Sequence, residues 1–159
     1  MQTNINKFGS KINKINYLFI ILFSIFLLIM LLIGQLGSLI NYQFTVNLGL
    51  QESADVISKF GVAMNKGFSI ADTIIYVPIL IFALVGFIKK QKWSVACMAG
   101  VMAITAYWPI VCLATLFFAK GTPDFYFTSY INYSIVLTAI SIISLYNFLV
   151  LCWSCRHCN

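Results

Sequence analysis

Charged residues are scarce in this sequence. They make up only 9% of its 159 residues, whereas a soluble globular domain carries about 25%. Only four residues are acidic, and there is a single histidine. This scarcity argues against a soluble domain, and it leaves few groups for acid–base chemistry.

The common catalytic and nucleotide-binding motifs are also missing. No run fits G-x-x-x-x-G-K-[ST], G-x-G-x-x-G or H-E-x-x-H. A Ser-His-Asp triad is not expected, because His157 and Asp72 fall on opposite sides of the topology argued below. No second carboxylate lies within an apolar run to pair with Asp72 for acid–base work. No named family is matched, and neither a cofactor nor a metal is expected.

Long apolar runs dominate the rest of the chain, which is 61% hydrophobic. A helix needs about 20 apolar residues to cross a bilayer core, and lipid offers no partner for open backbone groups. The sequence therefore predicts an all-α integral membrane protein. It forms a single membrane domain over 1–159, with helices at about 17–40, 68–88, 94–118 and 130–153. The first run is too long for a signal peptide and no A-x-A site follows it, so we expect it to be retained.

The basic residues predict the orientation of the chain. Seven of them fall on one side of the four runs: Lys7, Lys11, Lys14, Lys89, Lys90, Lys92 and Arg156. The other side has three lysines, which three acidic residues offset: Lys59, Lys66 and Lys120, with Glu52, Asp55 and Asp124. The positive-inside rule then places both termini in the cytoplasm. The net charge of +6 thus reflects orientation in the cytoplasmic membrane, and no nucleic-acid partner is expected.

Small residues at helical spacing predict how the helices pack. In lipid, close backbone approach and polar contacts drive helix association. Such pairs occur in three of the runs: Gly34 and Ser38, Ala83 and Gly86, Ala96 and Gly100, and Ala99 and Ala103. Short links between the later runs favour antiparallel neighbours, so we expect an up-down four-helix bundle. Pro78 and Pro109 are expected to kink their helices.

The first outer loop carries its own helical pattern. Ala54, Ile57, Phe60 and Met64 follow one another at spacings of three and four, which predicts a short amphipathic helix over about 51–64. Residues 65–67, Asn-Lys-Gly, are expected to turn the chain into the second run. This helix could be a lid over the bundle or a connector lying at the interface.

Asp72 is the one carboxylate inside an apolar run. Such residues are functional suspects by default. However, Ser69-x-x-Asp72 also fits a capping box, in which Ser69 is the N-cap and Asp72 meets the positive end of the helix dipole. Both interpretations stay open at this point.

The functional interpretation rests on the residues near Asp72. Polar and aromatic side chains gather in the outer half of the expected bundle, and a few convergent polar groups between aromatic walls describe a small-molecule site. We therefore predict an outward-facing pocket whose ligand-binding residues are Asp72, Gln35, Tyr76, Trp108, Asn132 and Tyr107.

The C-terminal cysteines suggest three states. Cys152, Cys155 and Cys158 form C-x-x-C-x-x-C with His157 inside it. On the cytoplasmic side they are expected to be reduced. They could be acylated, hold a metal or stay free.

The leading functional hypothesis is a non-enzymatic accessory or small-ligand-binding membrane protein. Its expected partners are the lipid bilayer, a small apolar ligand or lipid, and a second copy or another membrane protein. A transporter or channel subunit is the first alternative, and it requires a homo-oligomer because four helices enclose no wide pore. The second is a membrane enzyme acting on a lipid or quinone, with Asp72 as base and Tyr76 or Tyr107 as donor.

Overall fold

The computed structural model describes residues 12–121 and 130–155, and within these ranges the protein is helical without any strand. Four helical stretches in this part of the chain are long and apolar enough to cross a membrane: Lys14–Ile40, Ala54–Ile88, Lys92–Ala119 and Ile131–Ser154. The all-α prediction and the four long apolar helices are thus confirmed.

The first two stretches each contain a π-helical turn. The first consists of α2 (Lys14–Leu31), η1 (Leu32–Leu36) and α3 (Gly37–Ile40), and the short helix α4 (Tyr42–Asn47) follows it. The second consists of α5 (Ala54–Ala71), η2 (Asp72–Tyr76) and α6 (Val77–Ile88). The π-turn η2 ends just before Pro78, which cannot donate an N–H to the carbonyl of Ile74, so the backbone loosens there. The other two stretches are the single helices α7 (Lys92–Ala119) and α8 (Tyr130–Cys155).

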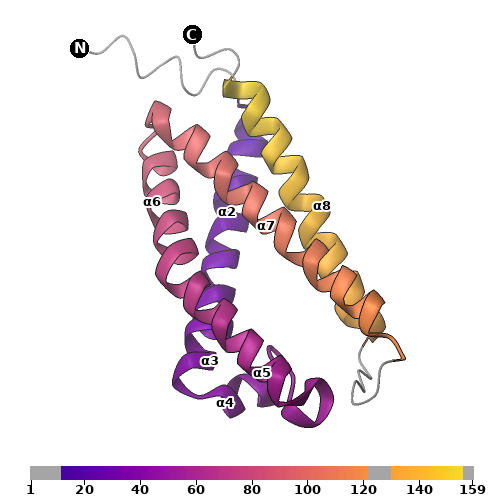
Figure 1. The fold of residues 1–159 in the computed structure, drawn as a ribbon. Helices are drawn as coiled ribbons and strands as arrows, with labels where there is room; N and C mark the ends of the chain where they lie inside the picture. Colours follow the sequence, from indigo (N-terminus) through magenta and orange to yellow (C-terminus); the bar gives the residue numbers. More distant parts are fainter. Residues whose placement is uncertain (1–11, 122–129, 156–159) are drawn as a thin grey trace, which may run out of the picture.

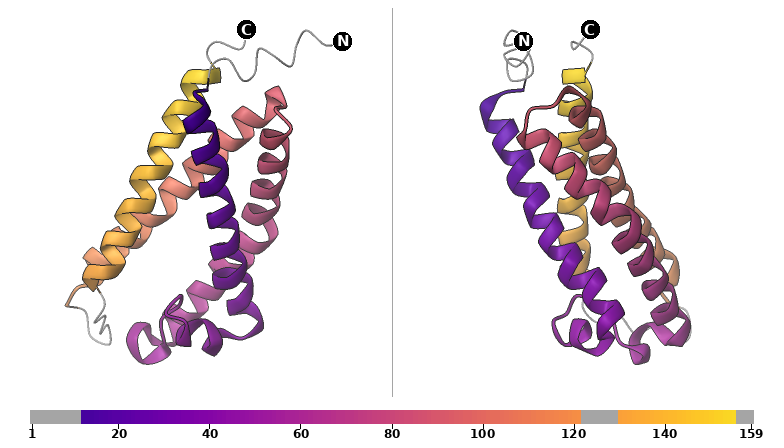
Figure 2. Two further views of the ribbon diagram at one scale, coloured as in Figure 1. Left: turned by 180° about the vertical axis from the view of Figure 1, so that it is seen from behind. Right: turned by 90° about the vertical axis from the view of Figure 1, so that its left-hand side faces the viewer.

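The helices pack as a bundle that opens toward one end. The start of α2, the α6–α7 connection and the end of α8 lie together at one end (Figure 1). The α7–α8 pair, packed along its length, leans away from α2 and α6 toward the other end, where α3, α4 and α5 lie (Figure 2). The packed core of α2, α6 and α7 includes Ile20, Leu80, Phe87, Met98 and Met102, all fully buried.

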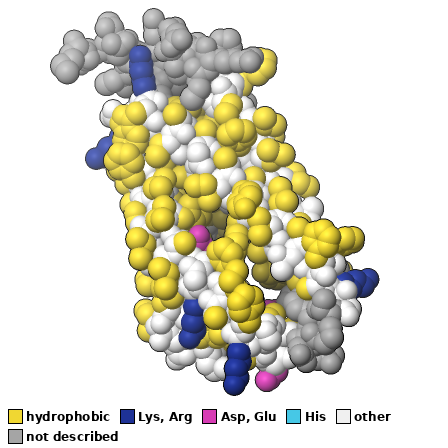
Figure 3. Space-filling model, in the orientation of Figure 1, with side chains coloured by type: hydrophobic (Ala, Val, Ile, Leu, Met, Phe, Trp, Pro, Cys, Tyr) yellow, Lys and Arg dark blue, Asp and Glu magenta, His cyan; other side chains and the backbone are white. Residues whose placement is uncertain are grey.

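The outer surface is strongly apolar. Large hydrophobic side chains are exposed on every long helix, for example Leu22, Phe82, Ile110 and Ile142. Hydrophobic side chains cover most of the face in Figure 3, and the lysines lie toward its two ends. A soluble monomer rarely exposes so continuous an apolar surface.

The structure corrects the prediction for residues 51–67. The helix there begins at Ala54, and it runs on through 65–67 into η2 and α6 without the expected turn. The apolar spacing shows why, because Ile57, Phe60, Met64 and Phe68 continue one face across the Asn-Lys-Gly sequence. The only break is at Ser58, whose φ of 65° is outside the helical range.

Ser69 is not a helix N-cap, so the capping-box interpretation is wrong. It lies inside α5, three residues before that helix gives way to η2. Its hydroxyl bonds to Gln35 and to the backbone of Asn65 instead of to the start of a helix. Asp72 therefore has no capping role to explain its presence in the apolar run.

Candidate functional site

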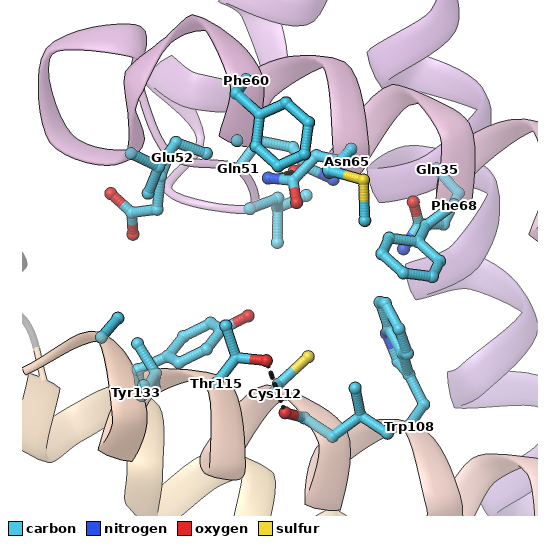
Figure 4. Close-up of a pocket in the computed structure, with 17 residues that line it drawn as sticks. Gln35, Gln51, Glu52, Phe60, Asn65, Phe68, Trp108, Cys112, Thr115 and Tyr133 are labelled. Carbon is cyan, nitrogen blue, oxygen red and sulfur yellow. Dashed lines mark hydrogen bonds between the residues drawn. The ribbon is translucent and has the colours of Figure 1, made fainter. Parts of the chain in front are cut away.

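A cavity of about 500 Å³ lies between α5 and α7, where the bundle opens. Residues of η1, of the loop before α5 and of α5 form one side, and residues of α7 and α8 form the other (Figure 4). Its walls combine apolar and polar side chains: Gln35, Leu50, Gln51, Glu52, Ile57, Phe60, Gly61, Met64, Asn65, Phe68, Trp108, Val111, Cys112, Thr115, Leu116, Ala119 and Tyr133. This volume falls in the range of about 300–1,000 Å³ that is usual for small-molecule sites.

Aromatic rings close one end of the cavity. Phe68 of α5 and Trp108 of α7 meet there, with ring centroids 4.4 Å apart and planes tilted by 57° (Figure 4). Tyr133 and Phe60 add two further rings to the walls. This arrangement offers both flat apolar contact and ring faces with negative electrostatic potential.

A polar network supports the side formed by α5. The Ser69 hydroxyl lies 2.6 Å from Gln35 Oε1, and the Ser38 hydroxyl lies 2.7 Å from that of Ser69. Because the Gln35 carbonyl oxygen is engaged by Ser69, its amide nitrogen is left to point toward the open space (Figure 4). The network therefore orients Gln35 as a hydrogen-bond donor to the cavity.

A second set of hydrogen bonds fixes the loop before α5. Asn65 Nδ2 donates to Gln51 Oε1 at 3.0 Å and to the Tyr42 hydroxyl at 3.3 Å. Tyr42 in turn donates to the backbone oxygen of Glu52 at 2.8 Å. These contacts hold residues 51 and 52 against α5, so the Glu52 side chain has a defined place at the cavity (Figure 4).

One acidic side chain, that of Glu52, is among the described residues that line the cavity. Partial burial removes water from Glu52 and raises the pKa of its carboxyl group. The Asp72 carboxyl group does not line the cavity. No Lys or Arg is among the described residues that line the cavity.

Two of the six predicted site residues, Gln35 and Trp108, line the cavity. Asp72 lies on η2 and is half-buried. Tyr76 is buried in the core, where its hydroxyl is hydrogen-bonded to Thr105 of α7. Tyr76 thus serves helix packing, and neither it nor Asp72 lines the cavity.

The structure does not bring Tyr107 or Asn132 to the cavity. Tyr107 is 66% exposed on α7, next to Trp108 but on another face. Asn132 is exposed on α8, and its neighbour Tyr133 lines the cavity instead. Consecutive residues of a helix point about 100° apart, so the neighbour of a residue that lines the cavity can face away from it, as Tyr107 and Asn132 do.

Most of the α5 side of the cavity is not predicted from the sequence. Residues 51–64 are expected to form a lid or a connector, yet Glu52, Phe60 and Met64 are part of the cavity wall, and so is Asn65. The apolar spacing of α5 was a signal that one of its faces packs against something. The partner of that face, α7, cannot be identified from spacing alone.

The C-terminal cysteines lie largely outside the described residues. Cys152 is a free thiol, partly buried, while residues 156–159 and the side chain of Cys155 are not described. Among the residues that the structure describes, no group of three or more His, Cys, Asp or Glu side chains could hold a metal ion.

Comparison of the chain with protein families, with curated proteins and with solved structures finds no match.

Proposed function

We propose that this protein is a multi-pass protein of the cytoplasmic membrane, an up-down four-helix bundle with both termini in the cytoplasm. Its four long helices and their exposed apolar side chains support membrane insertion. The excess of lysine on the side of the α6–α7 connection supports the orientation. In this orientation the cavity between α5 and α7 belongs to the outer half of the bundle.

Within that frame, the protein acts as a small-ligand- or lipid-binding component rather than as an enzyme. The observation that carries this proposal is the cavity of about 500 Å³ with apolar walls and a few positioned polar groups. Gln35 offers a donor and Phe68 and Trp108 offer ring surfaces. The hydrogen-bonded arrangement of Gln35, Ser38 and Ser69 supports a binding role for the polar side of the cavity.

Trp108→Ala tests this proposal, with Tyr107→Ala as the matched control. Both substitutions remove an aromatic ring from the same turn of α7, but only Trp108 lines the cavity. The purified full chain, in a mild detergent, is expected to retain a bound small molecule or lipid that native mass spectrometry detects. Trp108→Ala should lower its occupancy about tenfold, since truncating a buried aromatic anchor costs about 2 kcal/mol or more.

Tyr107→Ala should leave that occupancy unchanged. Equal loss in both variants, or a wild-type protein that carries nothing, would contradict the proposal.

A further inference from the structure

Glu52 is the only charged side chain among the described residues that line the cavity. Its carboxylate has neither a hydrogen-bond nor an ion-pair partner within the described part of the chain, while its backbone oxygen is held by Tyr42. In Figure 4 the carboxylate points into the open space opposite Tyr133 and Thr115. Binding of a neutral ligand would remove water from this carboxylate without giving it a new charged partner, which is energetically costly.

The cationic side chains of the same region do not neutralise Glu52. Lys66 of α5 places its Nζ 5.5 Å from the centroid of the Tyr42 ring, and neither it nor Lys59 lines the cavity. Lys120 is exposed at the end of α7. No cationic side chain of the described residues therefore offsets the charge of Glu52 at the cavity.

The aromatic walls favour the same kind of ligand. A cation over the face of Trp, Tyr or Phe is attracted by the ring, and most strongly where water is excluded. Trp108 and Phe68 meet at one end of the cavity, whereas Glu52 approaches from the loop before α5. A molecule lying between them would present its positive group to Glu52 and its apolar body to the two rings (Figure 4).

We infer that the cavity takes a lipophilic cation, that is, an apolar body bearing an ammonium or comparable positive group. Glu52 is its counter-ion, and Trp108 and Phe68 pack against its body. This inference rests on the proposed binding function and adds the charge of the ligand to it. The same chemistry occurs in free lipophilic amines and in the choline headgroup of a lipid.

Two probes of equal shape and opposite charge test the sign of the ligand. Tritiated tetraphenylphosphonium and tetraphenylborate are offered to the full chain in non-ionic detergent, and binding is followed by scintillation proximity. We expect saturable binding of the phosphonium, with the borate at least about tenfold weaker, because an unpaired and partly buried carboxylate repels the borate.

Substitutions at Glu52 then test the counter-ion. Glu52→Gln should weaken phosphonium binding roughly fivefold, the effect of one partly exposed charge pair. Glu52→Asp should restore most of the affinity, which separates loss of charge from loss of folding. Asp72→Asn should have a smaller effect, because it acts from outside the cavity. Asp55→Asn, which removes an exposed acid of α5 away from the cavity, is the matched control and should have none.

The failures are distinguishable. If both probes bind alike, or if Glu52→Gln and Asp55→Asn have the same effect, the inferred positive charge of the ligand is wrong. Binding that Trp108→Ala abolishes would then still support the proposed binding function of the cavity. If only octylamine displaces the phosphonium, the ligand is a free lipophilic amine. If only a short-chain phosphatidylcholine displaces it, the ligand is the choline headgroup of a lipid. Displacement by neither overturns the inference.

Discussion

Ser69 is fully buried, and its hydroxyl joins two helical segments that are distant in sequence. It contacts Gln35 of η1 and the backbone of Asn65 in its own helix, and Ser38 of α3 contacts it in turn. Hydroxyl groups in apolar surroundings keep a partner because an unpaired one is costly. Ser69 therefore positions the Gln35 amide that faces the cavity.

Ser69→Ala should lower the free energy of unfolding by about 1 kcal/mol, because Gln35 Oε1 loses its donor. Thr115→Ala is the control, since Thr115 is exposed and its hydroxyl bonds only to Val111 O within its own helix. That change should stay within about 0.5 kcal/mol. Thermal unfolding in detergent measures both, and equal effects would remove Ser69 from its bridging role.

At the scale of elements, α6 and α7 approach each other closely at Gly86. A Cβ built there would clash with the Trp93 ring and lie 2.8 Å from the Ser94 Cβ. Trp93 is itself stacked on Phe82, with ring centroids 4.3 Å apart. The α6–α7 hairpin thus depends on a residue without a side chain at its tightest point.

Gly86→Ala is expected to lower the free energy of unfolding by about 1–3 kcal/mol, because the Trp93 ring must leave its place on Phe82. Gly100→Ala on α7 is the matched control, since no atom lies within 4 Å of its Cβ position. Thermal unfolding should show a clear loss for the first and none for the second. A loss of similar size at both sites would show that general helix effects, not the contact with Trp93, decide the result.

The same glycines show how far the sequence predicts packing. Both belong to small-residue pairs that we expected to face a neighbouring helix, and Gly86 does, whereas Gly100 is exposed. Spacing places residues on a common helix face, but it cannot tell whether that face meets a helix or the surroundings. Helix length, in contrast, follows from local pattern, so three of the four long apolar helices begin and end within a few residues of the prediction.

The candidate site was harder to predict, for a related reason. Gln35 and Trp108 could be chosen from their depth in the expected bundle, but Tyr107 and Asn132 have the same depth and face elsewhere. The depth of a residue in the bundle follows from its position along the apolar run. The direction of its side chain depends on how the helix is rotated in the bundle, which the sequence does not show.

At the scale of the whole molecule, the two ends of the bundle differ. Near the α6–α7 connection, Tyr17 of α2 donates to the backbone oxygen of Phe87 at 3.2 Å and the core is tightly filled. At the other end the α7–α8 pair leans away, and the cavity lies between it and α5 (Figure 2). The proposed binding site is thus at the end that the lysine distribution assigns to the outside.

This assignment predicts opposite labelling of two lysine positions. Lys66 and Lys90 are both exposed, but Lys66 is on α5 and Lys90 is in the α6–α7 connection. In a chain whose native cysteines are replaced by serine, Lys66→Cys should react with a membrane-impermeant maleimide in intact cells. Lys90→Cys should react only after the membrane is opened, because three lysines keep its connection on the cytoplasmic side.

Labelling of Lys90→Cys alone in intact cells would invert the topology and turn the cavity inward. Labelling of both would mean that the segment between them, η2 and α6, does not cross the membrane.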